Sequence, residues 1–162
     1  MKWSEFTATA PHMGTLATEA FTDEHLATLG TLRANGWPRV SPCEVYFVDG
    51  EMLLGMMPES AKALDLRRDP RITVVNGQEQ RIPKRGDVKL YGTAREIMRD
   101  RQELRDRFAD AQEAVINWRP TDPFHLFAVD ILSASYISFG EGKRYLRWSA
   151  ERGEEELPHP EG

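Results

Sequence analysis

The chain has a single cysteine, no long apolar run and no excess of basic residues, and each shortage excludes a class of protein. Cys43 stands alone, so no disulfide forms within the chain, and a zinc site built on paired cysteines is excluded. No segment approaches the roughly 20 apolar residues that a membrane-spanning helix needs. Acidic residues outnumber basic ones 26 to 21, which argues against a nucleic-acid-binding surface.

The N-terminal sequence MKWSEFTATAPHMG lacks the apolar core of a signal peptide, so we expect the protein in the cytoplasm, without a membrane partner. A chain of 162 residues suits one compact domain, which we place at residues 1–150. Residues 151–162 are acidic, contain proline and have almost no apolar side chains. That composition predicts a disordered acidic tail.

Two dipeptides predict hairpin turns early in the chain. Asn35-Gly36 and Asp49-Gly50 each follow an apolar stretch, and these residue types tolerate the positive φ of a tight turn. They predict three consecutive antiparallel strands. The strands cover residues 25–33, 37–48 and 51–57.

The remaining chain continues the same architecture. We predict further strands at residues 71–76, 88–97 and 124–139, with a short edge strand at 143–149. Helices are predicted at residues 11–21, 60–68 and 100–117, and a polar loop at 77–86. Since most strands are consecutive and helices are few, a doubly wound α/β fold is disfavoured. The pattern indicates a mainly β (α+β) antiparallel barrel or sandwich.

The segment Glu59–Arg71, ESAKALDLRRDPR, directly follows an apolar strand and has the residues of a phosphate site. Ser60 stands at the start of a helix whose first backbone N–H groups point the same way, and Lys62 adds a positive charge one turn in. An ordinary capped surface helix accounts for the same residues. The residues alone leave both interpretations open.

Other chemistry has weak support in the sequence. The four histidines show no metal-ligand spacing, and no GxSxG nucleophile motif occurs. Cys43 on a predicted strand is interpreted as a small buried hydrophobe. Met56 and Met57 fit either the wall of a cofactor pocket or the core.

Three segments, taken in order, resemble the pyridoxamine 5′-phosphate oxidase-like family of flavin-binding split barrels, within the flavin/deazaflavin oxidoreductase superfamily. They are LATLGTLRANGWPRVSPCEVYFVDG, MLLGMMPESAKALDLRRDPR and DVKLYGTAREI, within Leu26–Ile97. The resemblance implies a six-stranded antiparallel split β-barrel with a few flanking helices. It also implies an intertwined homodimer with two cofactor sites at the subunit interface.

The resemblance also implies a set of cofactor-binding residues. Arg39 corresponds to an arginine that approaches the flavin phosphate or ribityl chain, and Ser60 and Lys62 match the phosphate-binding turn. The third strand of the family runs against the flavin at Gly55 and Met56. The full set is Arg39, Val40, Ser41, Pro42, Gly55, Met56, Ser60, Ala61 and Lys62.

Departures from the family pattern argue against oxidation of pyridoxamine phosphate itself. Ala61 replaces a second basic residue and Asp87 replaces a glutamine near the flavin. In the family a C-terminal aromatic residue sometimes covers the partner's cofactor, but for Trp148, with Arg147, we favour packing over the barrel end.

The expected function is an FMN-dependent oxidoreductase that transfers hydride to a small conjugated or aromatic substrate. The cofactor carries such chemistry, so no side chain is nominated as catalytic. The alternatives are a reductase that uses the deazaflavin coenzyme F-420, a non-catalytic module that binds flavin or haem, and an interaction domain that has lost its cofactor.

Overall fold

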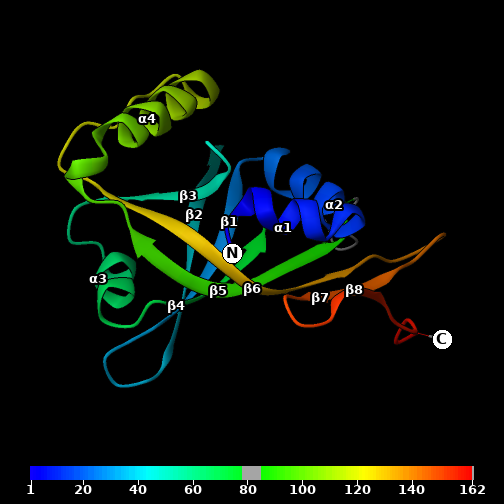
Figure 1. The fold of residues 1–162 in the computed structure, drawn as a ribbon. Coiled ribbons are helices and arrows are strands. Elements are labelled where there is room, and N and C mark those ends of the chain that lie inside the picture. Colours follow the sequence, from blue (N-terminus) through cyan, green and yellow to red (C-terminus); the bar gives the residue numbers. More distant parts are fainter. Residues whose placement is uncertain (78–84, 162) are drawn as a thin grey trace.

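The computed structural model describes residues 1–77 and 85–161, so the loop predicted at 77–86 lies mostly outside the described residues. Its centre is an antiparallel barrel (Figure 1). Six strands run in the order β3-β2-β1-β4-β5-β6, and pairing of β3 with β6 closes the barrel. The strands are β1 Leu26–Leu32, β2 Pro38–Val48, β3 Glu51–Met56, β4 Arg71–Asn76, β5 Asp87–Glu96, β6 His125–Ile137, β7 Tyr145–Ser149 and β8 Gly153–Glu156.

This architecture confirms the predicted six-stranded split barrel with a few flanking helices. The described helices are α1 Trp3–Thr9, α2 Pro11–Thr22, α3 Ala61–Arg68 and α4 Gln102–Ile116, the last preceded by a 3-10 turn at Arg99–Arg101. The sequence analysis missed α1, because seven residues are too few to show a helical period. No helix of the described residues is both long and apolar enough to cross a membrane.

The two predicted hairpin turns are present. Gly36, Asp49 and Gly50 all have positive φ, at 83°, 52° and 75°. These turns set the register in which β1 pairs with β2, and β2 with β3. The short connection between β2 and β3 holds the start of β3 next to the end of β2.

Strand β3 is buried on both faces, which explains its uninterrupted apolar sequence. Met52, Leu54 and Met56 point into the barrel core, whereas Leu53 belongs to a second cluster beneath α4. Helix α4 therefore covers the outside of the barrel at β3 (Figure 1). The N-terminal helices fill the barrel from another side, where Phe6 packs edge-on against Trp148 at 4.9 Å.

The C-terminal tail differs from its prediction as a disordered segment. Residues 153–156 form β8, which pairs antiparallel with β7. The outer edge of β7 would otherwise present unpaired backbone groups. Gly153 has φ of +72°, a conformation that suits glycine in a tight turn.

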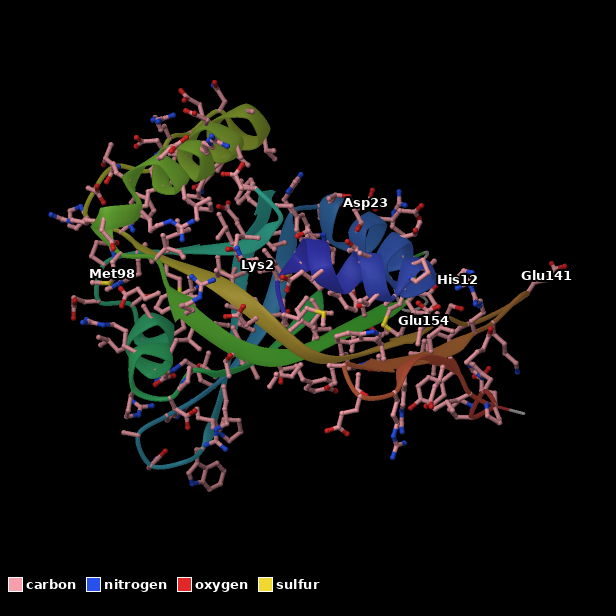
Figure 2. The ribbon with its side chains drawn as sticks, in the orientation of Figure 1. Lys2, His12, Asp23, Met98, Glu141 and Glu154 are labelled. Atoms are coloured by element: carbon pink, nitrogen blue, oxygen red, sulfur yellow. The ribbon has the colours of Figure 1, made fainter. Side chains whose placement is uncertain are left out.

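Side chains of the tail add contacts that its composition does not reveal. The Glu154 carboxylate accepts the Met13 backbone N–H at 3.0 Å and lies 2.9 Å from His12 Nδ1. Figure 2 shows His12 and Glu154 next to each other between α2 and β8. Glu154 thus serves as a specific acceptor, whereas the prediction took the acidic composition of the tail as a sign of disorder.

Candidate functional site

The turn between β3 and α3 holds a buried hydroxyl without a hydrogen-bond partner. Ser60 occupies the N-cap position of α3 with extended backbone, and its carbonyl accepts the Leu64 N–H at 3.0 Å. Its side chain, however, makes no capping bond, and Ser60 Oγ is buried without a partner among the described residues. A buried hydroxyl without a partner is costly. Ser60 Oγ therefore lacks a hydrogen-bond partner within the described part of the chain at the start of α3, although Ser60 does not itself line the neighbouring cavity.

Lys62 extends from the first turn of α3 to the middle of β2. Its Nζ donates a hydrogen bond to the Pro42 carbonyl at 2.6 Å. Beside it lies a cavity of about 240 Å³. The cavity is lined by Leu26, Pro42, Cys43, Glu44, Gly55, Met56, Met57 and Lys62.

Arg39 does not join Lys62 in this cavity. Its Nε donates to Asp65 Oδ2 at 2.6 Å, and the same carboxylate accepts Thr31 Oγ1 at 3.0 Å and Arg68 Nη2 at 3.1 Å. Burial alone would raise the pKa of Asp65, but the hydrogen bonds from Arg39, Arg68 and Thr31 outweigh it and lower the pKa. Arg39 thus acts in an ion pair that fastens α3 to the sheet.

The predicted site residues fall into two groups. Pro42, Gly55, Met56 and Lys62 line one cavity, and Ser60 and Ala61 lie directly before Lys62 in the chain. Arg39, Val40 and Ser41 do not line it. Val40 is 72% exposed on the outer face of the sheet.

The two methionines have different roles. Met56 is 4% exposed and belongs to the barrel core, whereas Met57 is 74% exposed at the cavity mouth. The sequence analysis did not assign Cys43 and Glu44 to the site. Glu44 could have been predicted as a site residue, because it lies two positions after Pro42 on β2 and residues two apart share a strand face.

Cys43 is not a reactive nucleophile. Its side chain is 5% exposed, and its thiol donates a hydrogen bond to the Gly55 carbonyl oxygen at 3.4 Å. Burial raises the pKa of the Cys43 thiol to about 11, although nearby Lys62 lowers it somewhat. The thiol is therefore protonated near neutral pH and serves as part of the cavity wall.

A second cavity of about 290 Å³ adjoins the first and is bordered by α4 through Phe108 and Gln112. The two cavities share Glu44, Gly55, Met56 and Met57. Gly55 lets Phe108 of α4 approach β3 closely, since a Cβ at this position would lie 2.5 Å from Phe108 Cζ. The packing of Phe108 within this chain therefore explains why position 55 is a glycine.

The outer face of the sheet carries a third, larger concavity of about 580 Å³ over β5 to β8. Lys89, Tyr91 and Arg147 line it, and Arg147 Nε donates to the Tyr145 hydroxyl at 2.7 Å. Trp148 also borders it but is 3% exposed, which agrees with packing at the barrel end. Among residues 1–77 and 85–161, no three His, Cys, Asp or Glu side chains form a metal site.

The comparisons with known proteins agree with one another on the fold. The profile of the family "Pyridoxamine 5'-phosphate oxidase" matches residues 13–138. The haem-binding protein of Mycobacterium smegmatis is 21% identical, with a TM-score of 0.66, over 84% of this chain and 57% of that one. The chain thus spans little more than half of the mycobacterial protein. No curated protein is significantly similar in sequence.

Two further solved structures have the same fold at low identity. HutZ, the haem storage protein of Vibrio cholerae, is 15% identical, with a TM-score of 0.58, over 71% of this chain and 87% of that one. A Clostridium acetobutylicum protein is described as related to general stress protein 26, in the pyridoxine phosphate oxidase family. It is 15% identical, with a TM-score of 0.63, over 83% of this chain and 92% of that one.

Proposed function

The chain belongs to the pyridoxamine 5′-phosphate oxidase family, and from this premise we propose that it is an FMN-dependent oxidoreductase. One observation carries the proposal. The Ser60 hydroxyl is buried without a partner among the described residues at the N-terminus of α3, two residues before Lys62 in the chain. A phosphate at this point would receive the hydroxyl, the ammonium and the first N–H groups of α3.

The chain's residues would divide the work of holding the cofactor. Ser60 and Lys62 would bind the phosphate, and Pro42, Gly55 and Met57 would line the path of the remainder along β2 and β3. Bound flavin supplies hydride transfer. The protein orients it and excludes water, and the substrate is expected to be a small conjugated or aromatic molecule in the cytoplasm.

We further propose that the working unit is a homodimer. A cavity of about 240 Å³ is smaller than the ~300–1,000 Å³ of pockets that enclose drug-sized ligands, so one protomer leaves part of an FMN uncovered. The outer sheet face exposes Val40, Tyr91 and Leu132, at 72%, 42% and 58%. Exposed apolar side chains on one face are typical of an interface.

Haem binding without catalysis is the second candidate, because two of the similar folds are described as haem-binding or haem-storage proteins. Haem in proteins usually takes an axial histidine, cysteine, methionine or tyrosine ligand. Among the described residues, no histidine lines either cavity at β3, although Cys43, Met56 and Met57 do. Cys43 is buried with a raised pKa and Met56 lies in the barrel core, so Met57 is the one exposed side chain of a ligating type among the described lining residues. The lack of a histidine ligand in this lining favours FMN.

The test is a titration of the purified protein with FMN, coenzyme F-420 and haem, each followed by absorbance. Saturable FMN binding with reduction by a nicotinamide would support the proposal. A preference for the deazaflavin would make the protein a reductase of that class, and haem alone would favour the non-catalytic alternative. Light scattering tests the dimer, where a monomer at micromolar concentration would contradict the shared site.

A further inference from the structure

The cavity under α4 is lined mainly by apolar and aromatic side chains. Its volume of about 290 Å³ is at the lower end of the ~300–1,000 Å³ typical of small-molecule sites, which suits a ligand of one or two rings. Its lining combines β2, β3, α4 and the segment that leads into β6. The apolar lining residues are Met56, Met57, Pro58, Phe108, Trp118, Pro120, Pro123 and Phe124.

The aromatic floor of this cavity is held rigidly. Phe108 stacks on Phe124 with ring centroids 5.9 Å apart, and Tyr46 meets Phe108 edge-on at 5.4 Å. The buried Arg105 guanidinium lies 4.2 Å from the Phe124 ring centroid and donates to the Phe124 carbonyl at 2.8 Å. A flat apolar ligand would therefore meet a preformed surface.

The rim of the cavity is exposed and apolar. Met57 and Trp118 are 74% and 57% exposed, although both line the cavity. Large apolar side chains with such exposure, placed around a concavity, mark a ligand site more often than a bare surface. Trp118 also places a fluorescent reporter at the mouth.

One end of the cavity is polar and negatively charged. Glu44 is the only charged residue among the described lining residues, and Gln112 Nε2 donates to its Oε2 at 2.5 Å. Gln112 is 5% exposed, so this bond holds the carboxylate in place. Lys62 borders the adjoining cavity together with Glu44, but its ammonium donates to the Pro42 carbonyl at 2.6 Å, so the Glu44 carboxylate can still accept from a ligand.

We propose that this cavity binds a small aromatic molecule that carries an amine or another positively charged N–H group. The ring would pack on Phe108 and Phe124, and the N–H group would donate to Glu44. Anionic ligands of the same shape would be rejected, because a carboxylate or phosphate beside Glu44 would place like charges together.

The position of the cavity makes its ligand the substrate of the proposed flavin site. Glu44, Gly55 and Met57 border both cavities, so the two ligands would lie against the same stretch of β2 and β3. This assignment as substrate rests on the proposed function. The binding preference itself does not, because it follows from the lining residues alone.

The experiment compares three probes with the same ring, 4-ethylbenzylamine, 4-ethylbenzyl alcohol and 4-ethylbenzoate, titrated into the full chain without FMN. Tryptophan fluorescence reports binding. We expect the amine to bind at least about ten-fold more tightly than the benzoate, the effect of one charge-assisted hydrogen bond. Glu44→Gln should abolish that preference, whereas Glu103→Gln, an exposed acid of α4 outside the cavity, should keep it.

Two further variants separate this site from the flavin site. Trp118→Phe should remove the fluorescence change, and a signal that persists would place the probe elsewhere and overturn the proposal. Equal binding of amine and benzoate, or no binding of the amine, would also overturn it. Lys62→Ala should weaken FMN binding but keep the preference for the amine, so failure of one site is distinguishable from failure of the other.

Discussion

Two basic residues that the family resemblance assigned to one phosphate lie in contrasting environments. Arg39 is paired with a buried carboxylate, which also accepts hydrogen bonds from Thr31 and Arg68. Lys62, three residues before that carboxylate, reaches only a backbone carbonyl and borders a cavity. We call the part of α3 around Asp65 its saturated end, because the charges there are paired with one another. We call the first turn, with Ser60 and Lys62, its open end, because Lys62 borders the cavity.

The difference separates a structural task from a binding task within one short helix. The Asp65 cluster joins α3 to β1 through Thr31 and to β2 through Arg39. With the C-terminal half of α3 fixed in this way, its first turn is held beside the cavity. The hydroxyl of Ser60 and the ammonium of Lys62 are then not needed to fasten the helix. A preorganised site loses less entropy when its ligand binds.

The largest effect is expected from the saturated end. Asp65→Ala should lower the free energy of unfolding by about 2–3 kcal/mol, because Thr31 and the partly buried Arg39 lose their shared partner, while the more exposed Arg68 is solvated. Chemical denaturation followed by circular dichroism measures the change. Asp65→Asn, which keeps the shape and some hydrogen bonds, should cost less. Equal stability of Asp65→Ala and the parent protein would show that α3 is not fastened here.

At the open end the expected effect is on binding. Lys62→Ala should weaken FMN binding by about 1.5–3 kcal/mol, the range for a charge-assisted hydrogen bond, with the fold intact. Fluorescence titration with FMN measures it. Arg39→Ala is the matched control and should lower stability more than it lowers affinity. An unchanged affinity in Lys62→Ala would remove this lysine from the site.

Most of the barrel could be predicted from the sequence, because its signals are local. Asn35-Gly36 and Asp49-Gly50 specify turns with little help from the remaining chain. By contrast, β8 depends on contacts distant in sequence, such as Glu154 with His12 and Met13. Charge and proline content predicted disorder there, since composition does not reveal a distant acceptor.

The candidate site was predictable only in part, for a similar reason. Ser60 and Lys62 lie in one short segment, and the structure keeps them together. The pairing of Arg39 with Asp65 spans 26 positions, and the packing of Phe108 on Gly55 joins α4 to β3. No periodicity reports such contacts, so the aromatic floor emerged only from the structure, whereas alternation along β2 from Pro42 could have pointed to Glu44.

A smaller effect at the open end distinguishes a ligand contact from a helix cap. Ser60→Ala should weaken FMN binding by about 0.5–1.5 kcal/mol, the contribution of one neutral hydrogen bond. Stability without FMN should stay the same or rise slightly, because Ser60 Oγ makes no capping bond. An ordinary N-cap serine would lose about 1 kcal/mol of stability on the same change. Such a loss would identify Ser60 as a cap and weaken the phosphate assignment.

The smallest expected effect is the pH dependence of the stability that Asp65 contributes at the saturated end. The pKa of Asp65 is lowered below its ordinary value of 3.8, so its ion pairs stabilise the fold fully above that value and are lost as pH falls through the folded-state pKa. The stability difference between the parent protein and Asp65→Asn should therefore stay constant from pH 7 to pH 5 and begin to shrink only below about pH 4. Denaturation curves at several pH values measure it. A difference that already shrinks near pH 6 would mean that another group controls the contact, and α3 would then be fastened by something other than this carboxylate.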